Sequence, residues 1–262
     1  MTSTARDKRS FATEISVLRD DAGADAHKEA LLAIYEKLDV DDDRNRSTLV
    51  EEGLVAALVK ALERSYNKTT YFVYFAYKIL AILPGSFDDD PSLRSPANAT
   101  AIVNSGGLQH VLDFLDSSNE DEIVDTFYAY HGLCVIFAVQ VALKEDKGLS
   151  LAVAKLVMPV LVTLMETHGL DAEEHKSCDL FVSGCEMFMI CARAMEGLVE
   201  SAHAERMVQS AWSGITYHKN DSEVQEAGRD LLTRLVGPET ALEMIDHAEM
   251  HHCEDAECSC AA

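Results

Sequence analysis

The chain has 262 residues, of which 48% are hydrophobic, enough for one large domain or two small ones with a sizeable core. Its 45 acidic and 22 basic residues give a formal net charge of −23, which repels nucleic-acid phosphates and anionic lipid headgroups and favours basic partners or metal ions. The alternative is that the acidic residues only keep the protein soluble. We therefore expect a soluble protein that binds neither nucleic acid nor membranes.

The N-terminal segment, residues 1–24, carries basic residues interrupted by Asp7, followed by an amphipathic stretch from Phe11 to Leu18. Because no apolar core follows the basic residues, the pattern is not that of a secretory signal peptide, whereas a mitochondrial presequence stays open. We expect this segment to be partly flexible. Farther along, apolar stretches such as Leu133–Leu143 are interrupted by polar residues, so we expect none to reach the roughly 20 residues of a membrane-spanning helix.

Residues 25–240 form the predicted main domain. Apolar side chains recur there at intervals of three and four, and strict alternation is never sustained, so the sequence predicts an all-α fold. The capping boxes Thr48-x-x-Glu51 and Ser222-x-x-Gln225 predict two of the helix starts. The predicted helices cover residues 26–38, 48–64, 68–83, 100–116, 120–145, 150–167, 173–195, 200–218, 222–236 and 239–252.

Small residues recur at one position of successive helices. Gly132, Gly184 and Gly228 are each followed by apolar residues three, four and seven positions later, and Ala76 starts the same pattern. Glycine inside a helix costs about 1 kcal/mol relative to alanine, so three glycines at one position need a structural reason. We expect each to allow the close approach of a neighbouring helix, in about five degenerate helical repeats.

A second repeated feature places Gly53 and Gly106 before Leu-rich helices, with a looser copy at Pro159, where proline would start a helix. The segment Ile102–Cys134 contains a short helix ending in glycine, a Leu-rich helix, a Ser-Asn-Glu turn and a long third helix. This order resembles an armadillo repeat. Partial copies lie in Val50–Leu83 and Ser222–Gly237, and the resemblance extends over residues 25–237.

The resemblance to the armadillo and HEAT-like repeat family implies a right-handed α-solenoid, an armadillo-like superhelix whose third helices line a concave groove for extended peptides or other proteins. Members that bind nuclear-localisation peptides are similar in carrying Trp and Asn ladders, whereas this chain has a single Trp, Trp212, so we do not expect an import receptor. Phe72, Phe75 and Ile79 are predicted core residues. The predicted groove residues are Tyr74, Tyr77, Lys78, Tyr128, His131 and Arg229.

Four of the seven cysteines lie in apolar helical pattern, where a free thiol behaves as a small hydrophobe. An odd cysteine count in a chain of this length argues against a disulfide framework and favours a reducing compartment. We therefore expect a cytoplasmic or nuclear protein. The four are Cys134, Cys178, Cys185 and Cys191.

The C-terminal segment, residues 241–262, is expected to form a terminal helix and an acidic tail rich in imidazoles and thiols. His247 and His251 are four residues apart and share one face of a helix, and such ligands together with thiolates suit zinc or copper(I). The Cys-x-Cys spacing is not a standard zinc pattern, so a ligand-free acidic tail and a redox-active thiol cluster stay open. The candidate ligands are His247, His251, His252, Cys253, Cys258 and Cys260.

No motif for nucleophilic hydrolysis, phosphate binding, dinucleotide binding or zinc proteolysis occurs in the sequence. The sequence therefore predicts a non-catalytic interaction scaffold or adaptor, without a cofactor, that binds a basic or extended protein segment along an acidic concave groove. The alternative is a metal-binding or metal-sensing protein that uses the C-terminal cluster. An enzyme with a site assembled from dispersed residues is a third hypothesis.

Overall fold

The computed structural model describes residues 11–38, 43–64, 70–85, 94–116, 126–168, 175–195, 199 and 201–245. All regular elements in these ranges are helices, so the predicted all-α class is confirmed. The chain divides into two compact units. The first comprises Met1–Phe114 and Cys134–Asp146, and the second comprises Leu115–Leu133 and Lys147–Ala262.

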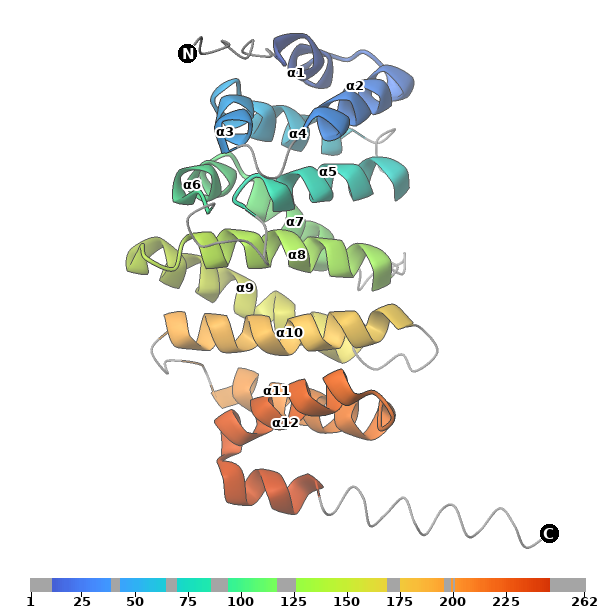
Figure 1. Cartoon of the computed structure of the whole chain (residues 1–262). Helices are drawn as coiled ribbons and strands as arrows, with labels where there is room; N and C mark the ends of the chain where they lie inside the picture. Colours follow the sequence, from blue (N-terminus) through green and yellow to red (C-terminus); the bar gives the residue numbers. More distant parts are fainter. Residues whose placement is uncertain are drawn as a thin grey trace, which may run out of the picture. The chain divides into compact units, whose positions relative to one another are not determined.

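Twelve labelled helices follow one another in the described part of the chain (Figure 1), and residues 238–245 are also helical. Their bounds are α1 Ala12–Arg19, α2 Ala24–Lys37, α3 Asp43–Glu51, α4 Leu54–Leu62, α5 Thr70–Ile82, α6 Pro96–Asn104, α7 Gly107–Asp116, α8 Thr126–Ala142, α9 Lys147–His168, α10 His175–Ala194, α11 Ser201–Tyr217 and α12 Ser222–Val236.

Two helices predicted as continuous are each divided by a glycine turn. Gly53, with φ of 86°, separates α3 from α4, and Gly106, with φ of 78°, separates α6 from α7. These left-handed angles suit glycine because it has no Cβ to meet the backbone. The apolar period continues across both turns, which is why residues 48–64 and 100–116 were each predicted as one helix.

Both predicted capping boxes are wrong because each helix begins earlier than its box predicts. Thr48 lies inside α3, where its Oγ1 donates to the backbone carbonyl of Arg44 at 2.8 Å. The N-cap of α12 is Asp221, whose carboxylate accepts the backbone N–H groups of Glu223 and Val224. Gln225 reaches back to the preceding helix instead, and its Nε2 donates to the carbonyl of Ile215 at 2.6 Å.

Helix α9 corrects two further predictions. Pro159 lies inside the helix and does not start one. Because proline has no backbone N–H group, this position cannot donate the usual helical hydrogen bond to the carbonyl one turn earlier. The same helix contains Lys147–Thr167, a stretch of 21 residues with a mean hydropathy of 2.0. By length and composition it could cross a membrane, contrary to the prediction that no stretch is long enough, and half of its apolar window is buried within the structure.

Helix α1 packs against α2 and α4 in the first unit. The helix buries Ile15 and Leu18, and its N-cap residue Phe11 is buried with them. All three are at most 1% exposed, although they lie in the N-terminal segment predicted to be partly flexible. Arg64 satisfies the end of the helix, since its guanidinium donates to the carbonyls of Leu18 at 2.9 Å and Arg19 at 2.8 Å. Apolar burial and helix capping therefore both hold α1 in place.

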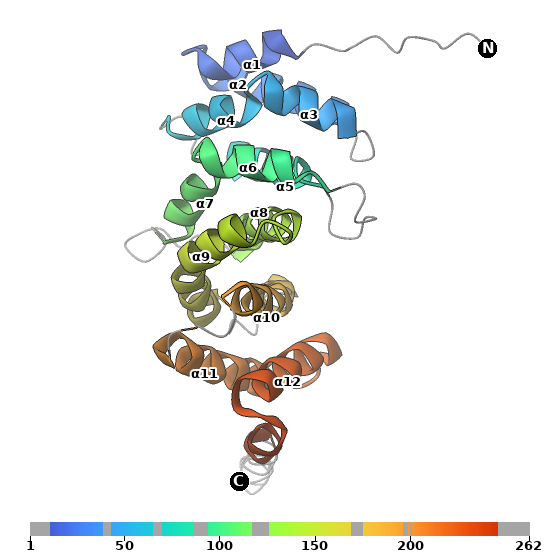
Figure 2. The same cartoon turned by 90° about the vertical axis from the view of Figure 1, so that its left-hand side faces the viewer.

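The second unit shows why glycine recurs at one helix position. A Cβ on Gly132 would lie 3.1 Å from the side chain of Leu115, and one on Gly228 would lie 2.7 Å from that of Ile215, while one on Gly184 would overlap Met165. Each glycine thus faces the preceding helix: Gly132 on α8 faces α7, Gly184 on α10 faces α9, and Gly228 on α12 faces α11. Figure 2 shows α11 and α12 side by side. The predicted close approach is confirmed.

Candidate functional site

The predicted groove residues of α5 point in different directions. Tyr74 and Lys78 are half-exposed and contact each other, with the Lys78 Nζ atom 4.6 Å from the centre of the Tyr74 ring. Tyr77 is fully buried and packs edge-on against Phe114, with ring centres 5.6 Å apart. Its prediction as a groove residue is wrong, because its ring is buried against Phe114 and does not reach the surface.

The remaining predicted groove residues belong to the second unit. Tyr128 is only 8% exposed, so its prediction as a partner contact is also wrong. His131 is half-exposed, with its ring 5.4 Å from that of Tyr130. Arg229 is exposed on α12. Of the six predicted groove residues, the structure thus brings together Tyr74 and Lys78 in one contact.

Around this contact, α2 and α5 form what we call the tyrosine–lysine surface. On α5 its members occupy positions i, i+3, i+4 and i+7, which share one helix face, and on α2 they are seven residues apart. All are half-exposed or exposed, while Phe72 and Ile79 on the same helix are buried as predicted. The surface comprises Lys28, Tyr35, Tyr71, Tyr74, Phe75 and Lys78.

Phe75 is at the centre of this surface, although the sequence predicted it in the core. Its ring centre lies 4.7 Å from that of Tyr71, 4.9 Å from that of Tyr74 and 5.0 Å from that of Tyr35. These separations are within the range in which aromatic pairs attract each other beyond simple burial. The four rings therefore support one another as a half-exposed group.

Two lysines lie over the rings at its edges. The Nζ atom of Lys28 is 4.4 Å from the ring centre of Tyr71, and that of Lys78 is 4.6 Å from Tyr74 and 6.0 Å from Tyr35. Burial alone lowers the pKa of Lys78, but its hydrogen bond to Tyr74 and the charge interactions with Tyr35 and Tyr74 together raise it. Lys78 is therefore cationic at neutral pH, and cation–π attraction orders the tyrosines.

Carboxylates border the surface on α2. Asp25, Glu29 and Glu36 are all exposed and lie on the helix face next to that of Lys28 and Tyr35. The surface thus combines an aromatic centre, two lysines and an acidic border. Sequence reasoning missed Tyr35 and Tyr71, although the spacing of Tyr71, Tyr74, Phe75 and Lys78 is a signal that could have identified the α5 half.

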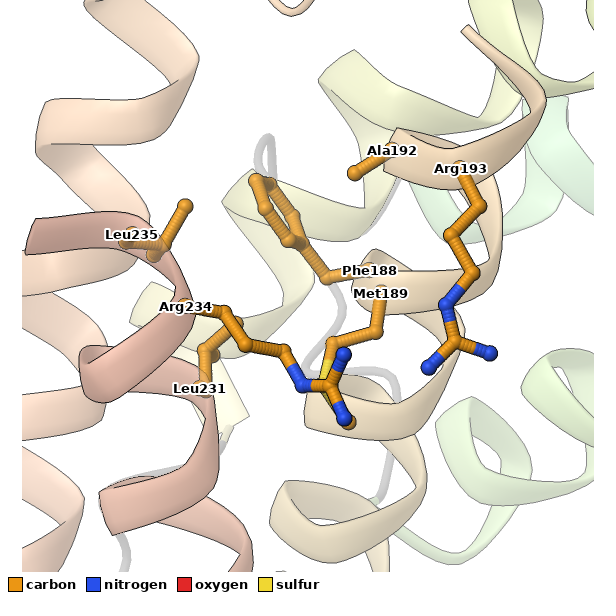
Figure 3. Close-up of a pocket in the computed structure, with 7 residues that line it drawn as sticks. All are labelled: Phe188, Met189, Ala192, Arg193, Leu231, Arg234 and Leu235. Atoms are coloured by element: carbon orange, nitrogen blue, oxygen red, sulfur yellow. The ribbon is translucent and has the colours of Figure 1, made fainter. Parts of the chain in front are cut away.

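A cavity of about 400 Å³ opens between α10 and α12 in the second unit (Figure 3). Its wall is apolar, and the guanidinium groups of Arg193 and Arg234 lie on the same side of it. Arg234 also pairs with Asp230 one turn earlier, at 3.2 Å. The cavity could accept an apolar side chain beside a carboxylate. Its apolar lining residues are Phe188, Met189, Ala192, Leu231 and Leu235.

Sequence reasoning did not find this cavity. On each of the two helices, the sequence shows apolar residues with an arginine three or four positions later. That α10 packs against α12 is a tertiary contact, which the local sequence pattern does not encode. Arg229, the residue predicted on α12, does not line it.

The predicted metal ligands His247, His251, His252, Cys253, Cys258 and Cys260 lie outside the described residues. In the ranges that the structure covers, no group of three or more His, Cys, Asp or Glu side chains is arranged to hold a metal ion. Cys134, Cys178, Cys185 and Cys191 are not in disulfides.

No protein-family model matches the chain, and no curated protein matches it. Among solved structures, the crystal structure of an engineered protein is similar with a TM-score of 0.60 and 18% identity, over 97% of this chain and 91% of that one. A second engineered protein has a TM-score of 0.49 and 14% identity, over 87% of this chain and 99% of that one. The first likeness concerns the fold alone and agrees with an all-helical class.

Proposed function

We propose that this protein is a non-catalytic interaction scaffold or adaptor, built as an armadillo-like right-handed α-solenoid of about five degenerate repeats. The order of a short helix, a glycine turn, a Leu-rich helix and a long helix supports this architecture. It occurs in α3 to α5 and again in α6 to α8. The equivalent glycine contacts in the pairs α7/α8, α9/α10 and α11/α12 support it further.

The observation that carries the proposal is the tyrosine–lysine surface. A folded protein normally buries such a group of rings, whereas here four adjacent aromatic side chains stay half-exposed. Tyrosine supplies a large contact area at a low cost in conformational entropy, and aromatic residues are enriched where proteins meet. Because neighbouring rings and lysines already order these side chains, little further ordering is needed on binding.

The partner is proposed to be a basic or extended protein segment. Its apolar side chains would cover the rings, and its lysines or arginines would pair with the carboxylates of Asp25, Glu29 and Glu36 on α2. The net charge of −23 would favour the approach of such a segment over long range. Binding should therefore weaken as salt increases, while salt-insensitive binding would indicate an apolar contact without charge pairing.

Affinity purification from the native cell tests the proposal. Wild type is compared with a Tyr74→Ala/Lys78→Ala double variant and with a matched control, Tyr217→Ala/Lys60→Ala, in which the replaced side chains are also exposed but lie elsewhere. We expect partners retained by wild type and the control to be lost by the first variant. Equal retention by all three proteins would exclude this surface as the binding site.

A chain ending at residue 246 separates the proposal from the metal hypothesis. We expect this truncation to keep the partner, since the tyrosine–lysine surface is intact. Loss of the partner on truncation would assign binding to the tail. Zinc or copper bound by the full chain and lost with the tail would show metal binding there, which would then be a separate activity.

We also propose a reducing compartment, the cytoplasm or nucleus, for this protein. The odd cysteine count in a chain of this length supports this.

A further inference from the structure

A thiol, an imidazole and a carboxylate meet in the second unit, where α10 and α12 begin and α11 ends. The Sγ atom of Cys178 lies 3.4 Å from the Nδ1 atom of His218. Asp221, at the start of α12, accepts hydrogen bonds from the backbone N–H groups of Glu223 at 3.0 Å and Val224 at 3.1 Å. The three side chains come from positions that are far apart in sequence or separated by a turn, and the fold brings them together.

The carboxylate interacts with both other groups. The Val224 N–H has the largest effect in lowering the pKa of Asp221; the thiol of Cys178, the Glu223 N–H and the charge of His218 lower it further, against the opposing effect of burial. Asp221 is therefore ionised at neutral pH. The hydrogen bond from the thiol and the charge interaction with the imidazole place the Asp221 carboxylate beside both Cys178 and His218.

Cys178 differs from its neighbours in access to solvent. It is half-exposed near the start of α10, whereas Cys185 and Cys191 are fully buried. Burial raises the pKa of Cys185, and it raises that of Cys191 to about 12, so both thiols stay protonated and unreactive. Cys134 is also half-exposed, on α8, and provides an internal standard for accessibility.

We propose that Cys178 is a reactive thiol, activated by His218 and positioned with Asp221, and that hydroperoxides and other soft electrophiles modify it. Nδ1 of His218 accepts the thiol proton, and the sulfur attacks one oxygen of the peroxide. The O–O bond breaks, and the departing oxygen takes the proton from the imidazole and leaves as water or an alcohol. The cysteine is oxidised by two electrons to a sulfenic acid, and the peroxide is reduced.

The same three residues are less well suited to bind a metal ion. Cys178, His218 and Asp221 do not form a group arranged to hold a metal ion, and Asp221 already uses its Oδ1 atom on two backbone N–H groups. A modification site requires a residue with access to solvent and a base close to its sulfur, and Cys178 is half-exposed with the Nδ1 atom of His218 3.4 Å from its Sγ atom.

Alkylation of the folded full-length chain by iodoacetamide at neutral pH, followed by peptide mass spectrometry, tests the proposal. We expect Cys178 to react about tenfold or more faster than Cys134, because its thiolate is favoured by the imidazole. Reaction of Cys178 at the rate of Cys134 or slower would overturn the proposal.

Two variants identify the cause of the reactivity. His218→Asn should slow alkylation of Cys178 about tenfold or more and leave Cys134 unchanged, whereas an unchanged rate at Cys178 would show that His218 is not the base. Alkylation of the buried Cys185 or Cys191 would show that this variant is partly unfolded. In that case His218→Gln, which keeps a planar polar side chain at this position, decides: a Cys178 alkylation rate several-fold below that of wild type supports the proposal, and an unchanged rate overturns it.

Hydrogen peroxide then tests the chemistry directly. Trapping with dimedone should give the sulfenic-acid adduct on Cys178 before any on Cys134. A first adduct on Cys134, or none on Cys178 at a peroxide dose that modifies other thiols of the chain, would contradict the assignment.

Discussion

At the scale of single residues, the helix glycines of the second unit set how closely helices pack. A Cβ on Gly214 would overlap the ring of Phe181, which is fully buried and cannot turn away. Overpacking of this kind costs about 1–3 kcal/mol, more than the roughly 1 kcal/mol that alanine gains in a helix. We therefore predict that Gly214→Ala lowers the free energy of unfolding measured in urea.

Gly132→Ala is the matched control for that substitution. Its Cβ would lie 3.1 to 3.3 Å from the flexible side chain of Leu115, which needs to move only slightly. The loss of stability should be clearly smaller than for Gly214→Ala. Equal losses for the two variants, or a stabilised Gly214→Ala, would show that the helices have room that the structure does not indicate.

Tyr77 gives a second test at this scale. Its side chain is fully buried, burial raises the pKa of the phenol, and its hydroxyl has no hydrogen-bond partner among the described residues. Removing an unsatisfied buried hydroxyl is neutral or stabilising, so Tyr77→Phe should leave the free energy of unfolding within about 0.5 kcal/mol of wild type or raise it. A loss above about 1 kcal/mol would indicate a hydrogen bond to the hydroxyl.

The assignment of individual α5 residues was only partly predictable. The period of the helix identified two faces, and it placed Phe72 and Ile79 correctly in the core. Phe75 and Tyr77 were exchanged, because both are aromatic and the sequence does not say which face meets a neighbouring helix. Hydrophobicity also misled, since Phe75 is the more apolar residue but remains half-exposed against three tyrosines.

At the scale of elements, the start of α12 depends on Asp221. Replacement by alanine removes two hydrogen bonds to backbone N–H groups and should cost about 1 kcal/mol, whereas serine should keep most of the capping energy. The order of stability at neutral pH, measured by denaturant unfolding, should be wild type, then Asp221→Ser, then Asp221→Ala. Equal stability of the alanine variant and wild type would exclude a role in capping.

The contribution of Asp221 should also depend on pH. Because its folded-state pKa is lowered from the ordinary 3.8, its stabilisation is fully present above that value and is lost as the pH falls through the lower folded-state pKa. The difference in unfolding free energy between wild type and Asp221→Ser should therefore shrink below about pH 3.8. A difference that grows as the pH falls would contradict the lowered folded-state pKa of Asp221.

Helix type was predictable, but several helix boundaries were not. The three- and four-residue spacing defined the class, and the glycine positions predicted the close packing of α8, α10 and α12. The turns at Gly53 and Gly106 were indicated by the repeat pattern, which places a glycine before each Leu-rich helix, but the predicted helix bounds ran through them because apolar residues continue on the same period. The start of α12 was misplaced by a competing capping signal, since Asp221 and Ser222 are both good N-caps.

At the scale of the whole molecule, the proposed solenoid predicts an extended particle. A compact protein of this length has a radius of gyration of about 18 Å. Small-angle X-ray scattering from the full chain, and from a chain ending at residue 245 so that the tail does not contribute, should give a clearly larger value for both, with a skewed distance distribution. A value near that of a compact sphere for the shorter chain would contradict the solenoid.

The central proposal is that the tyrosine–lysine surface binds a protein partner, and site-specific photo-crosslinking tests it most directly. A photoreactive phenylalanine analogue is placed at Tyr74 and, as a control, at Tyr217, which is 60% exposed on another helix. We predict that Tyr74 forms a crosslink to a defined protein in the native cell, and that this crosslink is absent from Tyr217 and weakened by added salt. Crosslinks from Tyr74 that are no more frequent than those from Tyr217 would contradict the claim.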